Sequence, residues 1–493
     1  MSIFQLKEWW SSGSLDGYGS SQIEEFDVGS LCVGNIDNST PVADKIITAS
    51  QTGVVRIYNP NSGPGFKATD LLHQEVLKQP VLQILCGRFL SEVGKTSTGY
   101  IGLAVLHSKK LVVYELLANK GSGALAVAAS SSNEGKGSDS AFYYSLAKVY
   151  EHDLEADGTK FAAYNMISGS FGGAEGREML MVQSMDGKIA IYEQSAHALT
   201  RQLAGCLLPG CLAYLPSIDA FVTSNYANQV ECYLYHVLAS SDTDIGSSSK
   251  ESSTSGRRVA IVEWSLQLGD TCRQIVPGLF TRMTLSSSQN RPGLGRRQAG
   301  EVLILCDKCL YLLKDSGRMM QQKRLEKQPA CLSAYDVIGS EMSNFIIVYA
   351  DGMVQVFSDF NVVWAAKLTG IRTSAVPVQA CVGPFGALRS ARTNAKRFIS
   401  LQPSPNLAPV AVLLFVHREF SGLVTIIDDG GATSVSYLGT KPSVTTAHAS
   451  SQHARDLDYG AIGRPRVSHV IYQELLYYLY LFIYIKTLST GSS

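Results

Sequence analysis

The chain has 493 residues, with 42 basic and 42 acidic side chains, so it lacks the basic excess expected of a general nucleic-acid binder. Its length is sufficient for one large core or for two or three ordinary domains. The ten cysteines are scattered and do not form a disulfide framework, and the N-terminal sequence MSIFQLKEWW lacks a signal peptide's apolar core. These features favour a reducing, intracellular compartment.

The N-terminal segment contains two adjacent tryptophans, Trp9 and Trp10, ahead of a Gly/Ser-rich linker. Large aromatic side chains contribute mainly through the area they bury, so we expect this pair to anchor packing and not to form a ligand platform. Strands of a first sheet are predicted over Phe26–Asn35 and Asp44–Tyr58, and those of a second over Pro80–Phe89 and Tyr100–Leu116.

The segment Glu178–Gln194 has the pattern of a β-hairpin. An apolar run, Met179–Val182, is followed by a Met-Asp-Gly turn and by an alternating run in which Ile189 and Ile191 face one side, while Ala190 and Tyr192 face the other. Asp-Gly supplies the positive backbone dihedrals of a tight turn. About seven similar segments recur, beginning near Gly53, Lys109, Gly187, Asn228, Cys309, Gly352 and Gly431.

The spacing of these segments is roughly forty residues where connections are short, which is typical of propeller blades with four strands each. We therefore predict an all-β fold, a single seven-bladed β-propeller over residues 1–460. Several interior strand positions should be buried: Ile46, Ile57, Leu82, Val105, Ile189, Val354 and Val356.

Four low-complexity or arginine-bearing stretches are predicted to be loop insertions between the recurring units. They cover residues 118–140, 240–256, 286–300 and 384–405. The arginines at Arg257–Arg258, Arg296–Arg297 and Arg389–Arg397 could contact anionic lipid or nucleic acid. Because no aromatic residues are interleaved with them, solvated loops are the preferred interpretation.

The pair Cys306 and Cys309 forms a CxxC motif within an apolar run. No second pair lies at zinc-ribbon spacing, since Cys206 and Cys211 are about a hundred residues away. Packed or turn cysteines are therefore favoured over a zinc or redox site.

Two glycine-rich stretches could suggest ligand binding. Gly169–Gly176 is not followed by Gly-Lys-Ser/Thr or by a helix, so we reject a phosphate cradle and expect a turn between blades. Asp428–Gly431 lacks the further acidic ligands of an EF-hand, so a hairpin turn is expected instead of a calcium site.

Isolated polar groups, His107–Ser108 and Glu151–Asp153, stand at predicted strand ends without a nucleophile motif. We therefore predict no catalytic, cofactor-binding or metal-binding residue, and no enzymatic activity.

A set of short segments, none specific alone, occurs in the same order as in a known family. They are Lys7–Ser11, Leu31–Asn38, Asp44–Ile47, Arg56–Tyr58, Pro80–Gln83, Leu103–Lys109, Tyr150–His152, Gly169–Gly173, Gln183–Gly187, Leu207–Gly210, Gln229–Glu231, Trp364–Ala365 and Ser436–Thr440. Through their number and colinearity, the chain resembles the amino-terminal propeller of the parathyroid hormone-responsive (Bardet–Biedl syndrome 9) protein family, from Met1 to about Gly460.

This resemblance implies a non-enzymatic scaffold subunit of the BBSome, a coat-like complex that carries membrane proteins into and out of cilia. The implied partners are other BBSome subunits and, indirectly through the complex, the ciliary membrane and an Arf-like small GTPase. The implied locations are the cytoplasm, the cilium, the basal body or centriolar region, and the ciliary membrane as a peripheral component. In the family a β-sandwich, a platform domain and helices follow the propeller.

The tail, residues 461–493, does not resemble the family. Its apolar run, Leu475–Ile485, is about eleven residues long, short of the roughly twenty that span a bilayer. One interpretation of the tail is a membrane-binding element. The other, which we prefer, is a product of truncation or alternative splicing that is not part of the fold.

Two other functions are weighed. A propeller enzyme would need polar or metal-binding residues on the innermost strands of several blades, and no such set is found. A generic propeller adaptor in vesicle coats is the other alternative.

Overall fold

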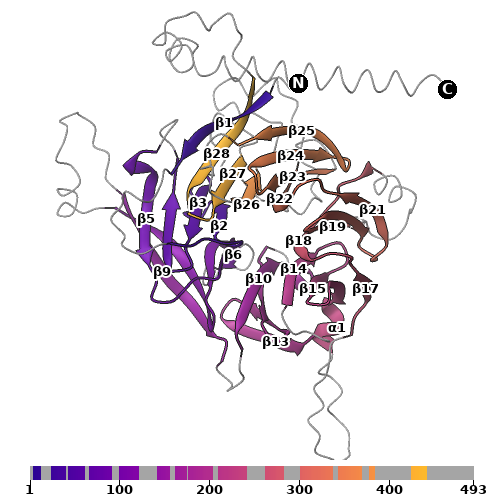
Figure 1. The fold of residues 1–493 in the computed structure, drawn as a ribbon. Coiled ribbons are helices and arrows are strands. Elements are labelled where there is room, and N and C mark those ends of the chain that lie inside the picture. The colour runs from indigo at the N-terminus through magenta and orange to yellow at the C-terminus, as the bar shows by residue number, and fades with distance from the viewer. Residues whose placement is uncertain are drawn as a thin grey trace, which may run out of the picture.

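The computed structural model describes fourteen ranges of the chain, namely residues 4–12, 24–39, 43–60, 66–91, 99–120, 142–155, 161–174, 176–203, 209–240, 261–282, 300–336, 342–368, 377–382 and 424–440. These residues form seven antiparallel sheets of four strands arranged around a common centre (Figure 1). The predicted seven-bladed β-propeller is therefore confirmed.

The first four blades follow one another along the chain, and each runs from an inner to an outer strand. The first comprises β2 (Leu31–Gly34), β3 (Lys45–Ala49), β4 (Val54–Tyr58) and β5 (Leu71–Val76), with a 3-10 turn, η2 (Ala68–Asp70). The second comprises β6 (Gln83–Leu90), β7 (Tyr100–Leu106), β8 (Lys110–Lys120) and β9 (Phe142–Asp153). The third comprises β10 (Ala163–Gly169), β11 (Met179–Ser184), β12 (Lys188–Glu193) and β13 (Ala196–Gln202), with η3 (Phe171–Gly173). The fourth comprises β14 (Pro209–Leu215), β15 (Ala220–Asn225), β16 (Gln229–Leu234) and β17 (Trp264–Gln267), with α1 (Tyr235–Ser240).

The last three blades complete the ring. The fifth comprises β18 (Cys272–Gly278), β19 (Glu301–Cys306), β20 (Cys309–Lys314) and β21 (Met319–Arg324). The sixth comprises β22 (Pro329–Asp336), β23 (Ser343–Tyr349), β24 (Met353–Ser358) and β25 (Asn361–Lys367). The seventh takes β26 (Pro377–Val382), β27 (Val424–Asp428) and β28 (Thr433–Thr440) from the C-terminal part and its outer strand, β1 (Phe4–Ser11), from the N-terminus.

The seven recurring segments found in the sequence are the third strands of the seven blades, from β4 to β28. Several of the turns that lead into them contain a glycine with positive φ, for example 97° at Gly53, 78° at Gly187 and 77° at Gly352. A side chain at these positions would be strained, which is why the sequence pattern of turn and strand is so regular.

The hairpin β11–β12 shows how a blade is buried. Ile189 and Ile191 pack into the core cluster shared by the third and fourth blades. Ala190 and Tyr192 point the other way, into the cluster shared by the second and third blades. The alternation predicted from the sequence is confirmed, because neighbouring blades cover both faces of the sheet.

Polar contacts also join the blades near the centre, where consecutive inner strands touch around the whole ring. At four seams, an amide side chain of one inner strand hydrogen-bonds to the backbone of the next blade. These contacts are Gln83 with Met166, Asn165 with Gly210, Gln274 with Leu332, and Gln379 with Gly29 and Leu31. Each amide satisfies backbone groups that the blade geometry leaves unpaired.

Strand β1 closes the ring by pairing antiparallel with β28, from Phe4 opposite Thr440 to Ser11 opposite Ser434. The register shifts between Glu8 and Trp10, which makes Trp9 the extra residue of a bulge. Trp10 is fully buried, so the predicted packing role is confirmed for this tryptophan.

The indole of Trp10 crosses from the seventh blade to the first. It packs edge-on against Tyr58, with ring centroids 5.5 Å apart, and at 6.2 Å from Phe66. Its Nε1 donates to Asp70 Oδ2 at 3.0 Å, and the backbone N–H of Lys67 donates to the same oxygen at 2.9 Å. One side chain therefore joins the two ends of the ring through both packing and hydrogen bonding.

Of the predicted interior positions, six are buried: Ile46, Ile57, Val105, Ile189, Val354 and Val356. The prediction for Leu82 is wrong, since its side chain is 36% exposed. Leu82 lies just before β6, outside the sheet's alternation, so the apolar pattern around it does not report burial.

The predicted insertions also need correction at their edges. Residues 118–120 belong to β8, which pairs with β9 as far as Lys120 opposite Phe142. Ser240 ends α1, and Gly300 is described immediately before β19. The rest of the four insertions and the tail lie outside the described residues. Within the described ranges, no helix is long and apolar enough to cross a membrane.

The closure predicts that Trp10→Ala destabilises the whole ring. Removing a fully buried tryptophan should cost about 3–5 kcal/mol, because it leaves a cavity between the first and last blades. Urea unfolding of both proteins would show this as a lower midpoint for the variant. Val363→Ala is the control, since Val363 is 57% exposed on β25. Equal midpoints for Trp10→Ala and the parent chain would contradict the role of Trp10 in closure.

Candidate functional site

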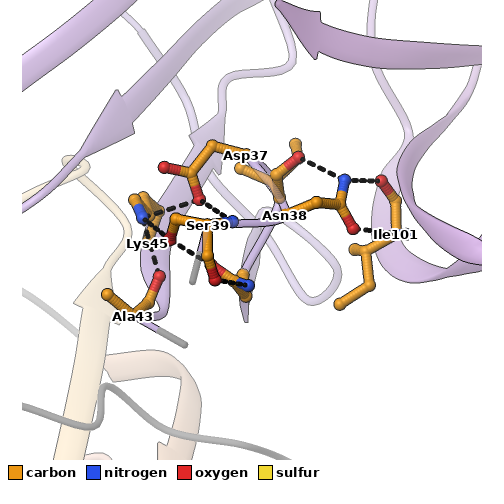
Figure 2. Close-up of polar contacts among 8 residues, drawn as sticks. Asp37, Asn38, Ser39, Ala43, Lys45 and Ile101 are labelled. Carbon is orange, nitrogen blue, oxygen red and sulfur yellow. Dashed lines mark hydrogen bonds and ion pairs between the residues drawn. The ribbon is translucent and has the colours of Figure 1, made fainter. Parts of the chain in front are cut away.

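A polar cluster occupies the connection between β2 and β3 in the first blade (Figure 2). Lys45, the first residue of β3, is 2% exposed. Its Nζ donates to Asp37 Oδ1 at 2.7 Å, to the Ala43 carbonyl at 2.7 Å and to Ser39 Oγ at 3.2 Å. A buried ammonium is tolerated only when it is paired and hydrogen-bonded, and these three acceptors meet that requirement.

The same connection is fixed to the second blade through Asn38 (Figure 2). The Asn38 amide donates to the carbonyl of Ile101 at 3.0 Å, and the backbone N–H of Ile101 donates back to Asn38 Oδ1 at 2.9 Å. Asn38 adopts a φ of 50°, a left-handed conformation that asparagine tolerates better than most residues.

Segments that carry the family resemblance, Leu31–Asn38 and Asp44–Ile47, therefore meet in this cluster. Its hydrogen-bonding groups serve one another and the neighbouring backbone. The arrangement is suited to holding a loop rigidly against the second blade, not to transferring protons or binding a substrate.

This geometry predicts that Lys45→Met is strongly destabilising. The substitution leaves the Asp37 carboxylate, whose side chain is 9% exposed, without its ammonium partner. Breaking a buried pair from one side costs about 3–5 kcal/mol. Urea unfolding of Lys45→Met and of the double variant Asp37→Asn/Lys45→Met would measure the loss in the free energy of unfolding. The double variant should recover part of the loss, and a double variant at least as unstable as Lys45→Met would contradict the pairing argument.

The CxxC motif spans the hairpin between β19 and β20. Cys306 is fully buried in the core shared by the fourth and fifth blades, and Cys309 is half-buried beside it. Hydrogen bonding to Cys272 and burial raise the pKa of the Cys306 thiol, whereas hydrogen bonds from Cys211 and Cys306 lower the pKa of Cys272. Both cysteines therefore pack at the hairpin between β19 and β20, as the sequence predicted for their position.

The sequence did not indicate that two further cysteines lie beside the CxxC motif. Cys272 lies opposite Cys306 in the β18–β19 register, and Cys211 comes from the neighbouring blade, with its thiol donating to the Arg273 carbonyl at 2.6 Å. The spacing of these residues along the chain carries no signal for this proximity.

The glycine-rich stretch Gly169–Gly176 forms the connection from β10 to β11, so it lies within one blade, and the expectation of a turn between blades is wrong. It packs on the next blade, because the backbone N–H of Gly172 donates to both carboxylate oxygens of Asp219, at 3.1 and 3.2 Å. Gly172 has a φ of 67°, which suits glycine. The Asp219 carboxylate occupies the amide that a phosphate would need.

The acidic stretch Asp428–Gly431 is a hairpin turn, as predicted. Asp428 is 2% exposed, and its Oδ1 accepts the backbone N–H groups of Gly430 at 3.1 Å and Ala432 at 2.8 Å. This carboxylate therefore stabilises the turn between β27 and β28.

The two histidines singled out in the sequence are buried and bonded to backbone. The Nδ1 of His107 lies 2.7 Å from the Pro80 carbonyl, and the Nε2 of His152 lies 2.6 Å from the Gln194 carbonyl. The ring of His152 also lies against Tyr192, with centroids 4.3 Å apart. Burial lowers the pKa of both imidazoles, because removal from water disfavours the charged ring, and the hydrogen bond to the carbonyl offsets only part of this effect.

Because the pKa values of both histidines are lowered, we expect the protein to lose stability in mild acid. Their folded pKa lies below the ordinary value of about 6.5, so the unfolded chain binds more protons around this pH, and stability falls as the pH drops below about 6.5. Melting temperatures at roughly pH 7 and pH 5 should show a smaller drop for His107→Gln/His152→Gln than for the parent chain. His236→Gln, at an exposed histidine on α1, is the control. Parallel pH profiles for the double variant and the parent would contradict the prediction.

A small cavity of about 140 Å³ lies where inner strands begin, between the fifth, sixth, seventh and first blades. Its lining is mainly apolar and includes Pro329, Ala330, Pro377 and Val378. The one arginine in the lining, Arg273, pairs with Asp307.

Among the described residues, no group of three or more His, Cys, Asp or Glu side chains is arranged to hold a metal ion. The arginines at 257–258, 296–297 and 389–397 lie outside the described residues.

These observations define a β-propeller whose polar clusters tie loops and blades to one another. Residues 1–394 match the family model described as PTHB1 N-terminal. The chain therefore belongs to the PTHB1 family, which confirms the parathyroid hormone-responsive family predicted from the sequence. It is 31% identical to Protein PTHB1 of Xenopus laevis and 32% identical to that of Homo sapiens, each over 93% of this chain. The chain spans 44% and 43% of the length of these relatives.

The fold is also similar to a solved structure of BBS1N in complex with ARL6DN, soaked with lead. The TM-score is 0.52 at 12% identity, with 86% of this chain and 95% of that chain covered. At this identity the likeness concerns the fold alone.

Proposed function

We propose that this chain is the propeller part of a non-enzymatic scaffold subunit of the BBSome, acting in the trafficking of membrane proteins to and from cilia. The observation that carries the proposal is membership of the PTHB1 family over residues 1–394, together with a closed ring of the same fold as BBS1N.

The site geometry supports a scaffold over an enzyme. The polar side chains that could have carried chemistry are engaged with backbone: Gly172 with Asp219, Asp428 with its own turn, and His107 and His152 with carbonyls. Each of these groups is already hydrogen-bonded within the fold. Their roles are to fix turns and seams.

The outer strands offer surfaces for partners. Apolar side chains are exposed on four of the described outer strands, and these are Val76 on β5, Tyr143 and Val149 on β9, Met319 on β21, and Val362 and Val363 on β25. We propose that other BBSome subunits contact this circumference. An Arf-like GTPase would associate through the complex, a proposal supported by the fold shared with BBS1N, which was solved with ARL6DN.

The proposed locations follow from this role: the cytoplasm, the cilium, the basal body or centriolar region, and the ciliary membrane as a peripheral component. A generic adaptor in vesicle coats is disfavoured, because the family match is to PTHB1 itself.

Affinity purification of the tagged chain from ciliated cells tests the proposal. We expect other BBSome subunits to co-purify, as they should with the full-length human relative used as a positive control. Val363→Asp adds a charge on an exposed strand without touching the core, and it should reduce recovery of any subunit that binds β25. Recovery of subunits with the relative but not with this chain would overturn the assignment.

A further inference from the structure

We propose that Cys32 and Cys86 form a site for a reversible disulfide that links the first and second blades, made by exchange with a small disulfide such as oxidised glutathione. The two sulfur atoms lie 3.3 Å apart although the residues are 54 positions apart in the sequence. Cys32 is on β2 and Cys86 is on β6, the inner strands of adjacent blades. The proposal does not depend on the proposed function.

The backbone around the pair is held in place from both sides. The N–H of Ile84 donates to the Gly29 carbonyl at 2.9 Å, which joins the two inner strands directly. Farther out, Asn38 bonds to Ile101 across the same seam. The two thiols are therefore kept close by contacts that do not involve sulfur.

The side chain of Cys86 lies beside Gly34 of β2. A Cβ added at Gly34 would lie 3.1 Å from Cys86 Cβ and 3.6 Å from its sulfur. Gly34 and Cys32 are two residues apart on one strand and so share a face. The absence of a side chain at position 34 leaves the space in which Cys86 approaches Cys32.

The contact between Cys32 and Cys86 stands at a seam that, within the described residues, lacks the amide hydrogen bond described at four other seams. Four seams between inner strands are bridged by amide side chains, as at Gln83 with Met166. At the seam between the first and second blades, β2 and β6 meet through sulfur. A disulfide here would replace a contact with a covalent bond, and the sulfurs need to approach by only about 1.3 Å to reach bonding distance.

The reaction balances as a thiol–disulfide exchange. Cys86 is half-buried, whereas Cys32 is 9% exposed, so Cys86 loses its proton to water and attacks one sulfur of oxidised glutathione. This forms a mixed disulfide and releases one glutathione thiolate. Cys32, after losing its proton, attacks the Cys86 sulfur and releases the second glutathione. The protein loses two hydrogens as two electrons pass to the glutathione disulfide, which becomes two thiols.

Peptide mapping tests the proposal. The full chain is incubated with reduced and oxidised glutathione at fixed ratios, blocked with N-ethylmaleimide and digested with trypsin without reduction. Each cysteine lies in a separate tryptic peptide, residues 8–45 and residues 79–88, with one cysteine apiece. We expect these peptides to be recovered linked, with a mass lower by two hydrogens than the sum of the free peptides, and to separate on reduction.

Three comparisons make the test specific to the folded geometry. The linked fraction at a given glutathione ratio yields the equilibrium constant for disulfide formation. This constant should be at least about tenfold higher in the folded chain than in urea, since folding holds the two thiols together. Gly34→Ala should lower it, because the new methyl displaces Cys86. Cys331→Ser, at a buried cysteine in a different core cluster, should leave it unchanged.

Two results would overturn the proposal. One is that both peptides remain free and alkylated at all ratios while the chain is folded. The other is that linkage is as extensive in urea as in buffer. Because the main measurement is made on the unaltered chain, a Gly34→Ala variant that fails to fold does not weaken the test.

Discussion

The pairing of β1 with β28 is the contact on which the ring depends. It joins residues more than 420 positions apart and gives the seventh blade its fourth strand. In an open chain of blades, the first and last would each expose an apolar sheet face and a row of unpaired backbone groups. Closure buries both, which is the reason a propeller leaves only short, protected edges.

Trp10 strengthens this closure because it acts in two blades at once. Its backbone pairs within the seventh blade, while its indole packs on Tyr58 and donates to Asp70 in the first. The bulge at Trp9 turns the strand at this point. The irregularity therefore lies directly beside the side chain that crosses the seam.

The polar residues of the described structure are best understood from the seams. A propeller brings inner strands together without pairing them as a sheet, so backbone groups there need other partners. Gln83 and Gln379 supply such partners. The polar side chains that the sequence singled out at Asp428, His107 and His152 are likewise hydrogen-bonded to backbone within the described structure.

The sequence by itself determined the number and type of the repeating units. Alternation with period two and glycine at positive φ are local properties, so the third strands and the two-sided burial of β12 could be predicted from residues close together in the chain. The turn at Asp428 could be predicted for the same reason. The family could be recognised because many short segments keep their order.

Only the tertiary structure decided which residues meet across blades. Nothing near Trp10 indicates that it belongs to the last blade, and nothing near Cys32 indicates Cys86, because these contacts depend on how the ring closes and how adjacent blades align. The exposure of Leu82 was missed for a related reason: its apolar neighbours belong to β6, and it stands just outside the strand whose pleat would have buried it. Local pattern determines the blades, whereas long-range packing determines the contacts between them.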